Sequence, residues 1–96
     1  MTLTKEQQEE QTRILERGTG WDAYGFARNI PGADIEALQQ VVLECKDGYF
    51  VYRFAKDIPG ADIQVLHQRL QALADESPEA RFYLSRFEDE LSDRLR

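Results

Sequence analysis

Two stretches of the chain, YGFARNIPGADIEALQQVVLE at 24–44 and YRFAKDIPGADIQVLHQRLQA at 52–72, are copies of each other. They form a 28-residue repeat, and 11 of their 21 aligned positions are identical. A recurrence with a period of roughly 20–50 residues is typical of supersecondary units that stack on one another. The chain is therefore predicted to contain an internal structural repeat.

Each copy predicts a pair of helices. The first helix covers Trp21–Asn29 in one copy and Tyr49–Asp57 in the other. Ile-Pro-Gly ends both, because proline disfavours helical geometry in the residue before it. Asp34 and Asp62 precede the second helices, where a carboxylate accepts hydrogen bonds from the free amides of the first turn. Apolar residues at helical spacing then predict one buried stripe on each second helix, namely Ile35, Leu38, Val42 and Cys45, and Ile63, Leu66, Leu70 and Leu73.

The segments outside the two copies also predict helices. Thr4 and Gln7 have the spacing of a capping box, which begins a polar helix that Gly18 and Gly20 are expected to end. Ser77–Glu79 combines a cap, a proline at the first helical position and an early acid, so a helix is predicted to begin there. Four apolar residues of that helix are expected to face inward: Leu84, Phe87, Leu91 and Leu95.

These elements predict a single all-α domain, a short α-solenoid-like stack of about six helices without a β-sheet. The 28-residue frame extends beyond the copies, because the same offset separates Trp21 from Tyr49 and Phe54 from Phe82. Terminal units are expected to diverge, since one of their faces meets water instead of a neighbouring repeat. The predicted parts are a half repeat (1–20), repeat one (21–48), repeat two (49–76) and a C-terminal capping helix (77–96).

The repeated pattern resembles tandem 28-residue α-helical repeats found in many uncharacterised bacterial and phage proteins. The residues that match are Phe26-Ala27 with Gly32-Ala33-Asp34-Ile35 and Leu38, and Phe54-Ala55 with Gly60-Ala61-Asp62-Ile63 and Leu66. Pro31 and Pro59 depart from that pattern, in which lysine is frequent at this place, and such arrays often contain more copies. The resemblance covers Trp21 to Leu73 and implies an α-solenoid-like stack without any particular activity.

The composition disfavours several classes of partner. A chain of 96 residues holds one domain, and its net charge is −6. A direct nucleic-acid binder needs a Lys/Arg stripe to displace counterions, and an anionic membrane attracts the same residues. No apolar run approaches the roughly 18 residues that span a bilayer, and the first residues lack the pattern of a signal peptide. We therefore expect a cytoplasmic protein that binds neither nucleic acid nor membranes, and homo-oligomers are compatible with the sequence.

The sequence predicts no catalytic residue, no metal site and no cofactor. Cys45 is the only cysteine, which is expected to be a reduced, buried small hydrophobe on a helix, the alternative being a reactive or intermolecular thiol. His67 is the only histidine, and it lies off the apolar stripe of its helix. A nucleophilic mechanism needs a histidine beside a nucleophile and a third group that orients it. One His and one Cys also lack the spacing of metal ligands.

Two clusters have a functional and a structural interpretation. In the acidic cluster Glu88-Asp89-Glu90 with Asp93, the residues Asp89 and Asp93 share a helix face. They either hold a divalent cation loosely, or the cluster is a solvated helix face in which Arg86, Glu90 and Arg94 have i, i+4 spacing. The second interpretation is favoured. The recurring pairs Tyr24/Tyr52 and Phe26/Phe54 either stack on nucleobases or form the repeat core, and their 28-residue recurrence favours the core.

The favoured function is a small non-catalytic protein–protein interaction module. Copies share what stacking requires, so partner contacts are expected where the copies diverge, as at His67 and Arg69. Trp21 and Tyr49 join them because aromatic residues and arginine dominate interface energetics. Arg69→Ala is expected to weaken binding by at least about 1 kcal/mol, unless Arg69 merely pairs with a nearby acid. The alternative is an acidic inhibitor, of a kind that a phage could encode, that occupies the nucleic-acid-binding surface of another protein.

Overall fold

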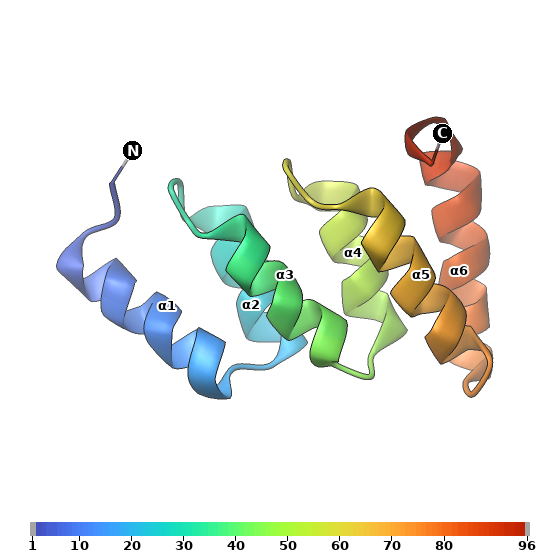
Figure 1. The fold of residues 1–96 in the computed structure, drawn as a ribbon, viewed down its shortest axis with the longest axis horizontal. Helices are drawn as coiled ribbons and strands as arrows, with labels where there is room; N and C mark the ends of the chain where they lie inside the picture. Colours follow the sequence, from blue (N-terminus) through green and yellow to red (C-terminus); the bar gives the residue numbers. More distant parts are fainter. Residues whose placement is uncertain (1, 96) are drawn as a thin grey trace.

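Six α-helices and one 3-10 helix form in the computed structural model, which describes residues 2–95. They are α1 (Lys5–Arg17), α2 (Gly20–Asn29), α3 (Ile35–Glu44), α4 (Gly48–Asp57), α5 (Ile63–Ala74), α6 (Pro78–Leu91) and η1 (Ser92–Arg94) (Figure 1). No strand occurs in this range, which confirms the all-α prediction. None of the described helices is long and apolar enough to cross a membrane. The predicted half repeat and capping helix extend to residues 1 and 96, which lie outside the described residues.

The predicted caps position the helix starts. The Thr4 side chain accepts a hydrogen bond from the Gln7 amide at 3.1 Å, and the Gln7 side chain accepts one from the Thr4 amide at 2.9 Å. Asp34 and Asp62 cap α3 and α5, and Ser77 caps α6 ahead of its proline. Each cap satisfies amide protons that have no partner within the helix. These start signals were therefore predicted correctly.

Two glycines begin helices, and one of them, Gly20, was expected to end the first helix instead. Gly20 and Gly48 are the first residues of α2 and α4, and both are buried. A Cβ atom on Gly20 would lie 3.0 Å from the Cys45 sulfur, and one on Gly48 would lie 3.2 Å from the backbone of Ala80. The glycines are therefore explained by the close approach of neighbouring chain segments. Only Gly18 ends α1 as predicted.

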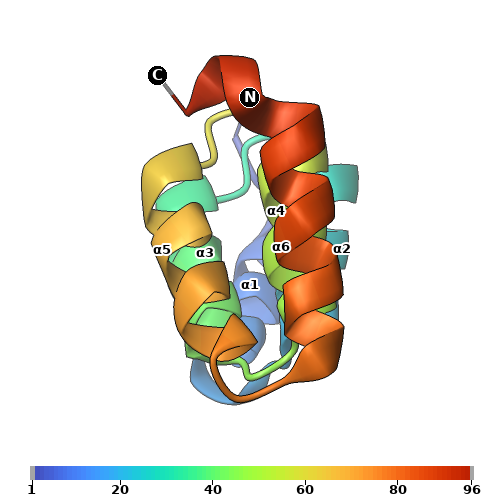
Figure 2. The same cartoon turned by 90° about the vertical axis from the view of Figure 1, so that its right-hand side faces the viewer.

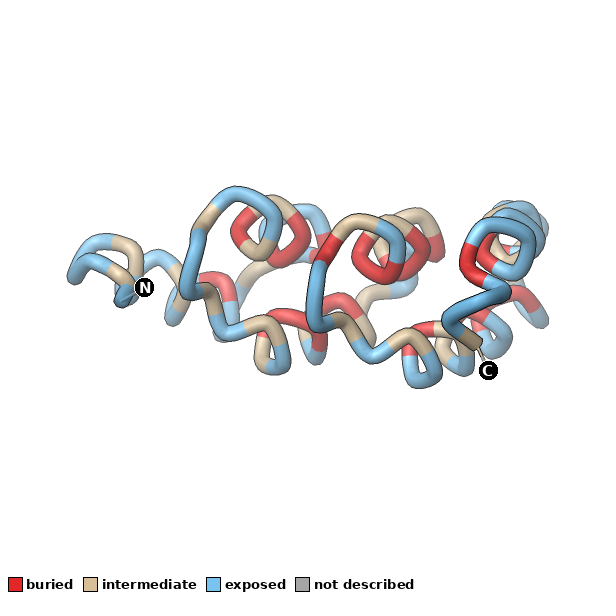
Figure 3. Tube along the Cα trace, turned by 90° about the horizontal axis from the view of Figure 1, so that it is seen from above, coloured by how far each residue is buried: buried red, intermediate tan, exposed pale blue. Residues whose placement is uncertain are grey.

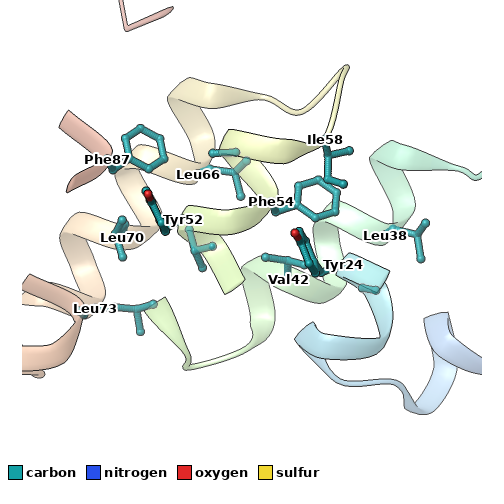
Figure 4. Close-up of a cluster of buried hydrophobic side chains, with 14 of the residues drawn as sticks. Tyr24, Leu38, Val42, Tyr52, Phe54, Ile58, Leu66, Leu70, Leu73 and Phe87 are labelled. Atoms are coloured by element: carbon teal, nitrogen blue, oxygen red, sulfur yellow. The ribbon is translucent and has the colours of Figure 1, made fainter. Parts of the chain in front are cut away.

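The helices form two layers with the core between them. Figure 2 shows α2, α4 and α6 on one side and α3 and α5 on the other, while α1 contacts α2 and α3 at one end of the stack. Buried residues line the space between the two layers (Figure 3). The predicted repeat core is confirmed, because the equivalent pairs Tyr24/Tyr52, Phe26/Phe54 and Leu38/Leu66 are all buried. Figure 4 labels five of these six residues, all except Phe26. Ile35 and Ile63 are partly buried beside them.

Two glutamines at equivalent places in the 28-residue frame join one repeat to the next. The Gln11 side-chain oxygen accepts a hydrogen bond from the Asp34 amide at 2.8 Å, and that of Gln39 accepts one from the Asp62 amide at 2.7 Å. Gln39 is the one buried polar residue within the described part of the chain, and this bond satisfies its carbonyl. Because Gln11 on α1 makes the same bond as Gln39 on α3, α1 is equivalent to α3, the second helix of repeat one.

The register of α6 differs from the 28-residue frame. The Tyr24 hydroxyl of α2 donates to Asp57 on α4, and the Tyr52 hydroxyl of α4 donates to Glu90 on α6 at 2.7 Å. The two donors follow the 28-residue frame, whereas the two acceptors have a 33-residue spacing. The extension of the frame to Phe82 is therefore wrong: Phe82 is 56% exposed, and Phe87 is fully buried in its place. Leu91 is also buried as predicted, and Leu84 and Leu95 are partly buried.

Candidate protein-interaction site

Two of the four predicted partner-binding residues lie at helix starts in the α2/α4/α6 layer. Trp21 is the second residue of α2, and 65% of its surface is exposed. Tyr49 is the second residue of α4 and is half-buried. Asp47 caps this helix by accepting a hydrogen bond from the Tyr49 amide at 3.0 Å, so the ring projects from a fixed first turn. The structure thus places both rings on the same layer.

His67 is engaged between α5 and α6. Its ring stacks on the Phe87 ring, with 5.3 Å between centroids, and its Nε2 lies 2.9 Å from a Glu88 carboxylate oxygen. Only 16% of the side chain is exposed. His67 corresponds to Gln39 in the 28-residue frame. Gln39 bonds the start of the next repeat, whereas no further repeat follows α5 among the described residues. The divergence of this position between the copies is therefore explained by its contact with α6.

Arg69 reaches back to the end of the preceding second helix. Its Nη2 donates to the carbonyl of Cys45 at 3.3 Å, where Cys45 is the residue that ends α3. Cations stabilise helix C-termini because unpaired carbonyls carry partial negative charge there. Arg69 forms none of the ion pairs found among residues 2–95, so the pairing with an acid that the sequence suggested is not observed.

An unbroken row of aromatic rings runs across α2, α4 and α6. The distances between successive ring centroids are 5.7, 5.2, 5.4 and 5.2 Å, and each pair meets edge to face. This geometry is favoured because the positive edge of one ring meets the negative face of the next. The row, here called the aromatic ridge, consists of Trp21, Phe50, Tyr49, Tyr83 and Phe82.

The ends of the aromatic ridge are exposed and its middle is supported. Trp21 and Phe82 are 65% and 56% exposed, while Tyr49, Phe50 and Tyr83 are half-buried. The Arg53 guanidinium lies 6.0 Å from the centre of the Tyr49 ring, and that of Arg86 lies 5.9 Å from the centre of the Phe82 ring. Aromatic and arginine side chains thus share one surface, which is the composition enriched in protein–protein interfaces.

The hydroxyls of the buried residues Tyr24 and Tyr52 hold the charged side chains beside the ridge. Arg53 pairs with Asp57 at 2.7 Å and donates to the Tyr24 hydroxyl, and this hydrogen bond raises the pKa of Arg53. Glu90 pairs with Lys56 at 2.9 Å and with Arg86 at 3.1 Å. The Tyr52 hydroxyl bond, followed by the Lys56 bond, lowers the pKa of Glu90 to about 2. The Glu90 carboxylate is therefore held in the charged form.

The low pKa of Glu90 predicts a pH-dependent difference between the chain and Glu90→Gln. Because the folded-state pKa lies below the ordinary value of 4.5, the contribution of Glu90 to stability is present above that pH and is lost as the pH falls towards 2. We expect Glu90→Gln to melt at a lower temperature at neutral pH, with the gap closing between about pH 4.5 and 2. Thermal unfolding followed by circular dichroism measures this, and a gap that stays constant with pH would contradict it.

The remaining candidates for chemistry are not assembled into a site. Cys45, expected to be buried, is half-buried at the end of α3, and burial raises the pKa of its thiol. A raised pKa leaves less thiolate, the nucleophilic form, at neutral pH. In the acidic cluster, Glu88 binds His67 and Glu90 binds Lys56, so two of its carboxylates face different neighbouring helices. Among residues 2–95 no group of three His, Cys, Asp or Glu side chains is placed to hold a metal ion.

Three residues of the aromatic ridge were missed by the sequence analysis: Phe50, Tyr83 and Phe82. A signal for them was present, because the pair Tyr49-Phe50 recurs as Phe82-Tyr83. These pairs have a 33-residue spacing, so an alignment in the 28-residue frame does not bring them together.

The chain was compared with protein-family models, with curated proteins and with solved structures, and none of them matches it.

Proposed function

We propose that this chain is a small non-catalytic protein–protein interaction module whose contact surface is the aromatic ridge. The observation that carries the proposal is the exposure of Trp21 and Phe82 at the two ends of one continuous row of rings. A large exposed aromatic side chain contributes little to the stability of its own fold, but it supplies much apolar area when a partner covers it.

The surroundings of the ridge support this proposal. Trp, Tyr and Arg are the residue types enriched among interface hot spots, and all three occur here. The half-buried rings Tyr49, Phe50 and Tyr83 limit the motion of the ridge, which reduces the entropy lost on binding. His67 and Arg69, the other predicted contacts, bond within the chain, so the proposal centres on Trp21 and Tyr49.

The contacts of the acidic cluster favour the ridge over the alternative of an acidic inhibitor. Such an inhibitor requires carboxylates that are available on one face. Glu88 is paired with His67, and Glu90 is paired with Lys56 and Arg86. Both carboxylates therefore already have partners within the same chain.

Single substitutions distinguish the aromatic ridge from the surface of α5 that carries His67 and Arg69. After affinity capture of a partner with the wild-type chain, titration calorimetry measures its dissociation constant for each variant. Trp21→Ala and Phe82→Ala are each expected to weaken binding by about 2 kcal/mol, the range of interface hot spots. His67→Ala and Arg69→Ala serve as controls and are expected to change it by less than about 1 kcal/mol.

Circular dichroism checks that each variant retains its helices. Unchanged affinity for both Trp21→Ala and Phe82→Ala would refute the ridge as the contact surface. If affinity depended on Arg69 and His67 instead, the partner would bind the α5 side of the stack.

A further inference from the structure

The three helices of the α2/α4/α6 layer pack by one repeated contact. On α4, the side chains that receive Tyr24 of α2 are Phe50, Arg53 and Asp57. On α6, Tyr52 of α4 is received in the same way by Tyr83 and Glu90, with Arg86 paired to Glu90. Both α4 and α6 therefore have a receiving side, which is the helix face that contacts the tyrosine of the preceding helix in the layer. The residues of this face occupy equivalent positions on the two helices.

The receiving side of α2 is open. On α2, Asp22, Gly25, Phe26 and Asn29 correspond to Phe50, Arg53, Phe54 and Asp57 of α4. Ile30, which follows α2, corresponds to Ile58, which follows α4. All five line a hollow of about 250 Å³ between α2 and α1, together with Glu10, Ile14 and Trp21. A second hollow of about 250 Å³ continues it towards Arg13 and Arg17. This N-terminal groove is thus the unoccupied continuation of the α2/α4 and α4/α6 interfaces.

Gly25 leaves space for a large side chain of an occupant. A Cβ atom at this position would meet nothing within 4 Å, whereas α4 carries Arg53 at the equivalent place. In the α2/α4 interface the incoming helix presents Tyr24 to this position, where Arg53 donates to its hydroxyl at 3.3 Å. The groove therefore matches a helix with an aromatic side chain at its centre.

The α1 wall of the groove favours a separate partner over a permanently packed helix of the repeat. In the 28-residue frame Glu10 corresponds to Leu38 and Leu66, which are both fully buried, whereas Glu10 is exposed. Arg13 corresponds to the partly buried Val41 in repeat one and to Arg69 in repeat two. A charged wall is stable in water when the groove is empty, so occupancy can be reversible. Arg13 and Arg17 form none of the ion pairs found among residues 2–95.

We propose that the N-terminal groove binds an amphipathic α-helix of a partner protein, with an aromatic side chain of that helix seated over Gly25. Helices bind such grooves through anchors on one face, while their polar face stays in water. This inference rests on the proposed function and extends it, because Trp21 belongs to both the aromatic ridge and the groove.

The probe is a synthetic helical peptide that copies residues 47–60, stapled on its solvent face because so short a helix is marginal in water. This peptide contains α4, which α6 receives in the equivalent contact, and it has no tryptophan. Trp21 is the only tryptophan of the chain and lines the groove, so its fluorescence reports occupancy. We expect a saturable blue shift of the Trp21 emission as the peptide is added.

Matched variants locate the binding. Gly25→Arg gives α2 the arginine that α4 carries at this position, where Arg53 donates to the hydroxyl of the incoming tyrosine, and it is expected to strengthen peptide binding at least about tenfold. Gly25→Ala adds one methyl group in open space and is expected to bind like the wild type. A peptide with Tyr52→Ser is expected to produce no shift, because it lacks the aromatic anchor.

Three results would overturn the inference: no saturable shift, equal or weaker binding by Gly25→Arg, or equal binding of the serine peptide. A shift that depends on protein concentration without peptide would identify a second copy of the chain as the occupant, which also overturns it. Phe82→Ala separates this inference from the proposed function. Phe82 lies at the other end of the ridge, so this variant is expected to bind the peptide normally while it loses the partner of the ridge.

Discussion

Phe54→Ala is expected to lower the free energy of unfolding by about 3–5 kcal/mol, the usual cost of deleting a phenyl ring from a packed core. The Phe54 side chain is fully buried between the two helix layers (Figure 4). Its loss removes apolar contacts with both layers and leaves a cavity that the rigid neighbours fill only in part. Phe26→Ala is expected to fall in the same range, because Phe26 has the equivalent place and is 5% exposed.

Urea unfolding followed by circular dichroism measures both losses. A domain of this size has a total stability of about 5–15 kcal/mol, so either variant is expected to be close to unfolding. Trp21→Ala is a suitable control because its ring is largely exposed. Losses below about 1 kcal/mol for both phenylalanine variants would show that these rings do not form the repeat core.

Phe87→Ala is likewise expected to cost about 3–5 kcal/mol, whereas Phe82→Ala is expected to cost less than about 1 kcal/mol. Both residues lie on α6, and truncation changes the helix propensity of each by the same amount. Phe87 is fully buried and carries the His67 ring on its face, whereas Phe82 is 56% exposed. The difference between the two variants therefore reports the register of α6 in the stack.

The same urea titration measures this pair, and the two variants serve as controls for each other. If Phe82→Ala were the more destabilising variant, the 28-residue frame would continue into α6 and the 33-residue spacing of the hydroxyl acceptors would be wrong. Similar losses for both would indicate that α6 packs without a defined register.

Much of the fold follows from local sequence signals. Proline and glycine after each first helix, the capping residues Asp34, Asp62 and Ser77, and the spacing of the apolar residues act within a few positions of one another. Local signals of this kind define where helices begin and end and which face is apolar. The duplication then indicated that two helix pairs pack alike, which placed Phe26 and Phe54 in equivalent core positions.

Part of the candidate site was also accessible from the sequence. Trp21 and Tyr49 were singled out because they occupy equivalent places on the opening turns, and the structure places both on the aromatic ridge. The sequence did not single out the other three residues of the ridge, Phe50, Tyr83 and Phe82. Whether a ring belongs to the ridge depends on its distance from rings on other helices, which the sequence does not give.

Only the tertiary structure decided the register of α6, the engagement of His67 and Arg69, and the opening of the N-terminal groove. Helix α5 is 12 residues long where α3 has 10, so α6 begins two positions later than the 28-residue frame places it. The residue of α6 that accepts from the tyrosine hydroxyl lies five positions later than the frame places it. His67 and Arg69 diverge between the copies because each bonds a segment that is distant in the sequence, as a partner contact would also require. A sequence pattern records which residues differ between repeats, but the reason for a difference lies in what each side chain meets across the layers.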